Sequence, residues 1–140
     1  MPIPPVVKDI NHPKVNATFR RKALAVLQDL AGHGLKAVFT ETVRTVARQQ
    51  YLFAQGRTRP GPKVTWKDGV KKKSNHQSGR AADIAFVGTD GKAYWPPLKV
   101  KTQAGGYTWG PQWDLVRRSA EAHGLKWGGY YWDGPHLELP

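Results

Sequence analysis

A polar loop runs into an alternating segment in the stretch Ser74-Asn75-His76-Gln77-Ser78-Gly79-Arg80-Ala81-Ala82-Asp83-Ile84-Ala85-Phe86-Val87. The alternation over 80–87 predicts a β-strand with Asp83 among alanines on one face. A charged residue in mid-strand is unusual, and its small neighbours leave room for an ion above the sheet. His76 precedes the strand and can fold back towards Asp83. Taken alone, such a pair is more often a solvated loop histidine and an aspartate paired with a surface Lys or Arg.

A second polar segment, Asp133-Gly134-Pro135-His136, lies near the end of the chain. Its Gly-Pro step excludes a helix interior, so Asp133 and His136 are not merely neighbours on a helix. A turn that leads into a strand can direct both side chains inward. An ordinary surface turn followed by an incidental histidine is the alternative for this segment by itself.

The two segments together contain every residue type that a catalytic zinc site needs. Such a site has three protein ligands and an open position for water, and His76, Asp83 and His136 would fill the three places. Asp133 would remain as a carboxylate that can take a proton from the water. The chain has no cysteine, so any metal must be held by His, Asp or Glu.

The order Ser-x-His-x-x-Gly-x-Ala-x-Asp, then Trp-Gly-Gly, then Asp-x-Pro-His resembles the D-Ala-D-Ala carboxypeptidase / L-Ala-D-Glu endopeptidase family. That family includes many phage endolysins and shares a core with the hedgehog signalling domain. The similarity runs from about Thr40 to His136. It implies that the family's zinc ligands fall on His76, Asp83 and His136, with one Zn²⁺ per chain, and its catalytic carboxylate on Asp133.

Three further residues are predicted to belong to the site. The segment 42–58 resembles the family's Tyr-Arg-Ser…Gln…Leu-Tyr…Gly-Arg-Thr stretch, and Arg44 matches the arginine that points into the site. Its guanidinium would hold a substrate carbonyl or carboxylate and stabilise the developing oxyanion; a structural pair with Glu41 is the alternative. Ser74 is a possible hydrogen-bonding neighbour. Glu138 shares a strand face with His136 and could orient that ligand or pair with Arg44.

The fold class that we expect is α+β: a single domain over 1–140, with its core over about 17–140 and no separate cell-wall-binding domain. A small antiparallel sheet would have about three helices packed around it, as in the hedgehog/D,D-peptidase fold that the resemblance implies. Helices are predicted at about 17–32, at 45–55 and from Pro111, and strands at 35–42, 80–87, 125–127, 130–132 and 136–139. A turn at 89–92 would close a hairpin. The loops 60–73 and 89–107 are expected to shape the substrate pocket.

Charge restricts the partners without selecting one. There are 22 Lys and Arg against 10 Asp and Glu, a net charge of +12, which favours nucleic acid, anionic lipid or the acidic polymers of a bacterial envelope. The first nine residues lack the basic and apolar regions of a secretory signal, and no window approaches the ~20 apolar residues of a membrane span.

The resemblance and these features together predict a phage endolysin that cuts the L-Ala-D-Glu bond of peptidoglycan. Such a protein is made in the host cytoplasm without a signal peptide and reaches the wall, in the periplasm, after a holin permeabilises the membrane. We expect a monomer, with possible contact to anionic envelope polymers or lipid. The alternatives are a D-Ala-D-Ala carboxypeptidase, a catalytically silent peptidoglycan-binding relative, or a basic nucleic-acid-binding module, for which the chain has no recognised motif.

Overall fold

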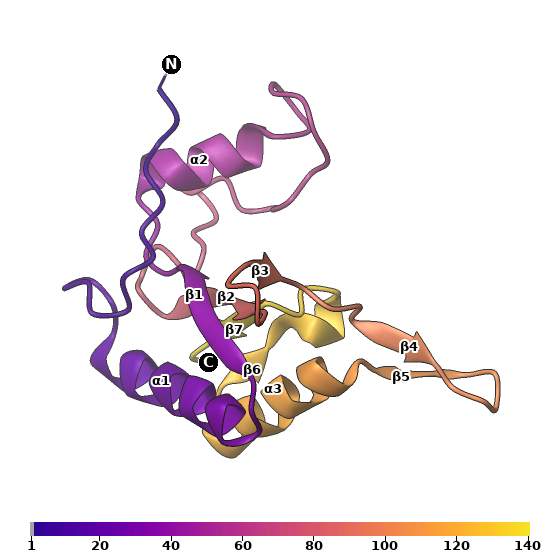
Figure 1. Ribbon diagram of the computed structural model, residues 1–140. Coiled ribbons are helices and arrows are strands. Elements are labelled where there is room, and N and C mark those ends of the chain that lie inside the picture. Colours follow the sequence, from indigo (N-terminus) through magenta and orange to yellow (C-terminus); the bar gives the residue numbers. More distant parts are fainter. Residues whose placement is uncertain (1) are drawn as a thin grey trace.

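The computed structural model describes residues 2–140, and within them it has three α-helices, seven β-strands and one 3-10 helix (Figure 1). In chain order these are α1 (Ala17–Gly32), β1 (Lys36–Glu41), α2 (Val46–Ala54), β2 (Ala81–Val87), β3 (Ala93–Tyr94), β4 (Lys99–Lys101), β5 (Tyr107–Trp109), α3 (Pro111–Ala122), β6 (Lys126–Trp127), η1 (Gly128–Tyr131) and β7 (His136–Glu138). The α+β class, with three helices around a small antiparallel sheet, is confirmed.

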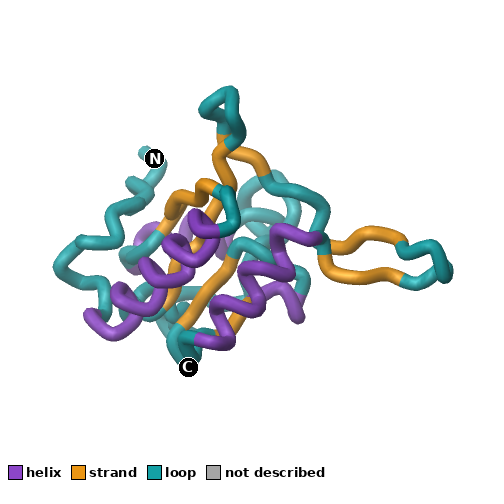
Figure 2. The backbone as a smooth tube through the Cα atoms, turned by 60° about the horizontal axis from the view of Figure 1, so that its bottom comes forward, coloured by secondary structure: helices purple, strands orange, loops and turns teal. Residues whose placement is uncertain are grey.

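The main sheet has five antiparallel strands with β2 at its centre. Its order is β1-β2-β7-β6, and the short β3 also pairs with β2. A second, two-stranded sheet is formed by the β4–β5 hairpin, which projects from the body of the molecule (Figures 1 and 2). In Figure 1, α1 and α3 lie below the main sheet and α2 lies above it. No helix within residues 2–140 is long and apolar enough to cross a bilayer.

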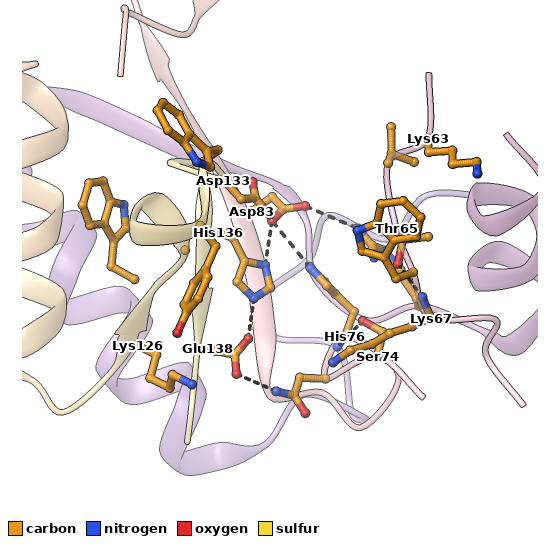
Figure 3. A pocket seen from close by; sticks show the side chains of 18 residues that line it. Lys63, Thr65, Lys67, Ser74, His76, Asp83, Lys126, Asp133, His136 and Glu138 are labelled. Carbon is orange, nitrogen blue, oxygen red and sulfur yellow. Dashed lines mark hydrogen bonds and ion pairs between the residues drawn. The ribbon is translucent and has the colours of Figure 1, made fainter. Parts of the chain in front are cut away.

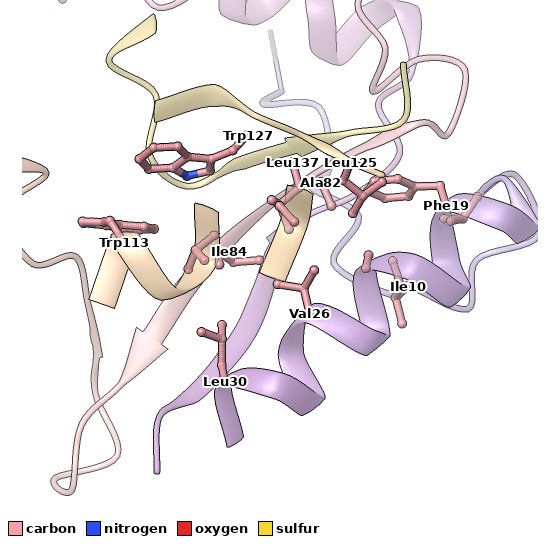
Figure 4. Close-up of a cluster of buried hydrophobic side chains, with 14 of the residues drawn as sticks. Ile10, Phe19, Val26, Leu30, Ala82, Ile84, Trp113, Leu125, Trp127 and Leu137 are labelled. Atoms are coloured by element: carbon pink, nitrogen blue, oxygen red, sulfur yellow. The ribbon is translucent and has the colours of Figure 1, made fainter. Parts of the chain in front are cut away.

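The hydrophobic core lies between the main sheet and the helices α1 and α3 (Figure 4). The fully buried side chains that the helices and β2 contribute to it are Phe19, Ala23, Val26 and Leu30 of α1, Ala82, Ile84 and Phe86 of β2, and Val116 and Ala120 of α3. The alternation of β2 therefore works as predicted, because the residues between Ala82, Ile84 and Phe86 face the other side of the sheet. Asp83 is one of these, so burial of the core directs its carboxylate away from apolar side chains.

The helices begin and end where the sequence predicts. Asn16 caps α1, with its Oδ1 accepting from the amide of Phe19 at 3.0 Å, and the hydroxyl of Thr45 caps α2 through the amide of Arg48. Pro111 occupies the first turn of α3. The predicted hairpin after β2 is also present, because β2 turns into β3.

The predicted strand at 130–132 is wrong. Tyr130 and Tyr131 belong to η1, and Trp132 has a left-handed backbone with φ of 68°. The chain turns here because the carbonyls of Gly128 and Gly129 accept the amides of Asp133 and Trp132, each at 3.1 Å. Aromatic residues favour strands in general, but the two glycines before them permit this tight turn. The β4–β5 hairpin was not predicted either; it begins within the segment 89–107, expected to be a loop, and ends at Trp109.

Gly79 is the position at which the loop before β2 docks against the start of α1. Its φ is +70°, and a Cβ added there would overlap the carbonyl oxygen of Lys14. Its own carbonyl accepts the amide of Asn16 at 2.9 Å. A residue other than glycine would therefore meet both backbone strain and a backbone collision.

We expect Gly79→Ala to lower the free energy of unfolding by more than about 2 kcal/mol, since a left-handed backbone costs a non-glycine residue about 1–2 kcal/mol before any collision is counted. Gly91→Ala is the matched control. Gly91 also has a positive φ, +79°, but nothing lies within 4 Å of its added Cβ, so only the backbone cost of about 1 kcal/mol applies. Urea titration followed by circular dichroism measures both, and equal losses would contradict the collision.

Candidate metal centre

Strand pairing brings together the two halves of the predicted ligand set. Asp83 of β2 lies directly opposite His136 of β7 in the antiparallel register, and Asp83 Oδ1 is 3.2 Å from His136 Nδ1. The same oxygen is 3.5 Å from His76 Nε2. One ligand atom from each of these three residues lies within 4.8 Å of the other two. Figure 3 shows both imidazoles directed at the Asp83 carboxylate.

His76 is held by the loop that contains it. Its ring is buried, with 2% of its surface exposed, and its Nδ1 lies 2.7 Å from the carbonyl oxygen of Thr42. A carbonyl only accepts, so Nδ1 carries the proton and Nε2 faces Asp83. The amide of His76 donates to the hydroxyl of Ser74 at 3.2 Å, and its carbonyl accepts the amide of Arg44 at 3.0 Å. Ser74 therefore shapes the turn that presents His76.

His136 is oriented by Glu138, as one of the two sequence hypotheses for that glutamate stated. His136 Nε2 lies 2.8 Å from Glu138 Oε1, and Glu138 Oε2 accepts from Asn75 Nδ2 at 2.7 Å. Glu138 therefore pairs with His136 and not with Arg44. Burial opposes a charge on His136, but its hydrogen bonds to Asp83 and Glu138 outweigh burial and raise its pKa to about 9.

The Asp83 carboxylate is the negative centre of the cluster. Burial opposes its charge, but the contacts with His136 and His76 outweigh burial and hold the pKa of this carboxyl far below its usual range. Its second oxygen, Oδ2, lies 3.4 Å from Arg44 Nη2. The carboxylate is thus ionised and oriented, with one oxygen turned to the histidines and the other to the guanidinium.

Arg44 satisfies both sequence hypotheses, because it pairs with Glu41 and also lies beside the ligand cluster. Its Nε lies 3.1 Å from Glu41 Oε1, so the structural pair exists. Its two terminal nitrogens reach Asp83 and, at 3.2 Å, the side-chain oxygen of Gln49. Arg44 therefore lies beside the ligand cluster and is anchored from three sides; its part in catalysis stays a prediction.

Asp133 lies beside the cluster without belonging to it. Its backbone amide donates a hydrogen bond to the carbonyl of Gly128, and the residue before it, Trp132, has a left-handed backbone. Its carboxylate makes no hydrogen bond or ion pair within residues 2–140. Burial first, and then the negative charge of Asp83, raise the pKa of this carboxyl above its ordinary value. A carboxylate with a raised pKa and free oxygens is suited to accept a proton.

The donor set fits a zinc ion. Two imidazole nitrogens and one carboxylate oxygen are ligands that zinc accepts, and three protein ligands are usual for catalytic sites. Both histidines have an acceptor on the ring nitrogen that faces away from the cluster, Thr42 for His76 and Glu138 for His136. Such partners accompany metal-bound histidines almost without exception.

Comparison with known proteins agrees with this geometry. A family model described as D-alanyl-D-alanine carboxypeptidase matches residues 68–139, the range that contains His76, Asp83, Asp133 and His136. The peptidoglycan L-alanyl-D-glutamate endopeptidase CwlK of Bacillus subtilis (strain 168) is 34% identical over 138 residues, covering 96% of this chain and 76% of CwlK. The chain belongs to the D-alanyl-D-alanine carboxypeptidase family. It is therefore an enzyme, a hydrolase of peptide bonds.

A solved structure supports the same fold for this carboxypeptidase-family chain. The crystal structure of the L-Ala D-Glu endopeptidase ChiX of Serratia marcescens superimposes with a TM-score of 0.54 at 22% identity. The match covers 91% of this chain and 81% of ChiX. At this level of identity the likeness establishes the architecture.

The carboxypeptidase-family centre lies in a cleft of about 720 Å³. One wall is the segment 63–67, and Lys126 lies on the opposite side of the cluster (Figure 3); Tyr131 and Trp132 also line the cleft. The prediction that the loop 60–73 shapes the substrate pocket is confirmed, since its residues 63–67 line the cleft. The same prediction for 89–107 is wrong: no residue of 89–107 lines this cleft, because that segment forms β3 and most of the projecting hairpin.

Sequence reasoning missed the polar residues that fix the cleft wall. Gln49 is fully buried; besides accepting from Arg44, it donates to the Thr65 hydroxyl at 3.2 Å and to the Lys67 carbonyl at 2.9 Å. Gln77 donates to the Gly69 carbonyl at 2.9 Å. A glutamine on an amphipathic helix gives no sign of such a role. The only available signal was the glutamine in the family stretch that contains Arg44.

We expect Glu138→Ala to weaken zinc binding by about 10- to 100-fold, because His136 loses the acceptor that orients it. Competition with a chromophoric chelator measures the affinity. Asp90→Ala, in the β2–β3 turn outside the cleft, is the control and should bind zinc as the wild type does. Unchanged affinity in a folded Glu138→Ala protein would show that Glu138 does not support the metal centre.

Proposed function

We propose that this protein is a zinc-dependent endopeptidase that cleaves the L-Ala–D-Glu bond of peptidoglycan stem peptides. The observation that carries the proposal is the 34% identity to CwlK, an endopeptidase of that specificity, over 96% of this chain. The ligand cluster formed by His76, Asp83 and His136 supports the dependence on zinc. The shape of the cleft supports a peptide substrate, because the ligand cluster lies in an open groove in which an extended chain can lie.

The residues divide the chemistry among themselves. His76, Asp83 and His136 would hold a zinc ion, and the bound ion would supply the Lewis acidity needed to activate water and polarise the scissile carbonyl. Asp133 takes the proton of the attacking water and delivers it to the leaving amine, since its oxygens are free and its pKa is raised. Arg44 fixes the outer oxygen of Asp83 and adds positive charge where the carbonyl oxygen becomes negative.

A D-alanyl-D-alanine carboxypeptidase is the second candidate. The description of the matching family model favours it. Both activities use the same metal chemistry and differ in how the cleft accepts the substrate beyond the scissile bond. The bond that is cut therefore separates the two candidates.

We further propose that the enzyme serves as a phage endolysin, made in the host cytoplasm and acting on the wall, in the periplasm, as a monomer once a holin has permeabilised the membrane. The net charge of +12 supports attraction to anionic envelope polymers or lipid, which would concentrate the enzyme at its substrate. Nucleic acid is not proposed as a partner, since the basic residues are accompanied by a complete set of hydrolytic groups.

Purified peptidoglycan tests the proposed reaction. We expect the zinc-loaded protein to clear a peptidoglycan suspension, a chelator to stop clearing, and added zinc to restore it. Mass spectrometry of the products should show stem fragments that begin with D-Glu. Release of free D-Ala instead would establish the carboxypeptidase, and clearing that is indifferent to the chelator would contradict the metal mechanism.

We expect Asp133→Asn to lower the rate of cleavage by about 10²- to 10⁴-fold, the usual contribution of general acid–base catalysis. Zinc affinity should stay close to that of the wild type, because Asp133 is not a ligand. Asp90→Asn, the same change in the β2–β3 turn, should keep full activity. A fully active Asp133→Asn protein would remove Asp133 from the role of base.

A further inference from the structure

Lys126 is a cation that the fold places next to the metal ligands. It lies on β6, where its register partner is Glu138 of β7. Cross-strand partners project to the same face of a sheet, and so do residues two apart on one strand. The side chain of Lys126 therefore stands on the face that carries Glu138 and His136. It lines the cleft, and Figure 3 shows it beside Glu138.

Within residues 2–140 the ammonium group of Lys126 makes no ion pair with a carboxylate, although its charge helps to lower the pKa of Glu138. The obvious partner is Glu138, but one of its oxygens contacts His136 and the other accepts from Asn75. No ion pair joins Lys126 to any acid within residues 2–140, and the side chain is exposed to the cleft. The other cation on the metal side, Arg44, is already bound to Glu41, Gln49 and Asp83. Lys126 is thus a cation on a strand beside the ligands that, within residues 2–140, is not held in an ion pair.

A backbone on a paired strand distinguishes Lys126 from the other lysines of the cleft. Lys63 and Lys67 line the opposite wall from a loop, and Lys63 lies 5.5 Å from the ring centre of Trp66. Lys126 instead stands on a strand that is paired with the strand of His136. The pairing of β6 with β7 fixes where the Lys126 side chain starts relative to His136, and its flexible stem lets the ammonium reach a substrate group in the cleft.

The proposed substrate has a carboxylate at the corresponding place. In a stem peptide, D-Glu continues the chain through its γ-carboxyl, so its α-carboxylate is free and sits on the carbon bonded to the scissile nitrogen. The terminal residue of a D-Ala-D-Ala peptide has a free α-carboxylate at the same position. A cation beside the metal can therefore bind the free α-carboxylate that both candidate substrates share.

We propose that Lys126 binds the free α-carboxylate of the residue on the amine side of the scissile bond. Lys126 is then a specificity-determining residue, which selects bonds that precede an amino acid with an unblocked α-carboxylate. This inference rests on the proposed function, because it takes a peptidoglycan stem peptide as the substrate. The inference assigns Lys126 a role in substrate selection that differs from the roles of the metal ligands and Asp133.

The test compares two synthetic peptides: L-alanyl-γ-D-glutamyl-L-lysine and the same peptide with the α-carboxylate of its D-Glu converted to a carboxamide. Hydrogen bonds to charged groups change free energies enough to predict that zinc-loaded wild type has a kcat/KM about 10- to 100-fold higher for the carboxylate peptide. Lys126→Met should reduce cleavage of the carboxylate peptide to the level of the carboxamide and leave the carboxamide rate unchanged. Lys126→Arg should retain most of the preference.

Lys36→Met is the matched control, because Lys36 is an exposed strand lysine of the same sheet outside the cleft. It should keep the wild-type preference. Equal losses on both peptides in Lys126→Met, or a wild type that does not distinguish the peptides, would overturn the proposal.

A binding measurement separates failure of this inference from failure of the proposed function. Zinc-loaded Asp133→Asn is titrated with each peptide by calorimetry, alone and combined with Lys126→Met. The carboxylate peptide should bind about 10-fold or more tightly, and only while Lys126 is present. If wild type cleaves neither peptide before D-Glu, the proposed bond is wrong, and the calorimetry still decides whether Lys126 recognises the carboxylate. Equal affinities in the presence of Lys126 refute the inference even if cleavage occurs.

Discussion

The antiparallel pairing of β2 with β7 is the constraint on which the site depends. It sets Asp83 opposite His136 and, in the same register, Ala82 opposite Leu137. Ala82 and Leu137 are fully buried in the core, so the register that fills the core also directs the two ligands to the cleft. A slip of one residue would exchange the faces and bury both polar side chains among apolar ones. Stability of the core and assembly of the metal centre therefore select the same pairing.

The sequence was informative wherever a residue's role depends on its near neighbours. Pro111 marks a helix start, and the alternation around Asp83 marks a strand with one polar position. The ligand set was found because its residues lie in two short segments with a recognisable order. Tyr130 and Tyr131 were misassigned because their intrinsic preference is overridden by the glycines before them.

The supporting residues were not predictable because their partners are distant in the sequence. Asn75 reaches Glu138 across 63 positions, and Gln49 bonds to Lys67 in a segment with no regular structure. Neither contact leaves a periodic or local signal. Lys126 was overlooked for a related reason, since a lysine on a short strand is ordinary until the oxygens of Glu138 are seen to be occupied. The ligands, and Glu138 as a support of His136, could be named from the sequence, whereas the contacts of Asn75 and Gln49 required the fold.

The same distant contacts join the substrate wall to the metal centre. Gln49, fully buried, links Thr65 and Lys67 of the wall to Arg44, and Arg44 in turn holds Asp83. Unsatisfied polar groups are costly inside a protein, so displacement of the wall would break bonds that reach a ligand of the centre. On the opposite side, Lys126 lies on β6, which is paired with β7. The wall formed by 63–67 is therefore joined by hydrogen bonds to a ligand of the metal centre, so substrate recognition and metal geometry belong to one network.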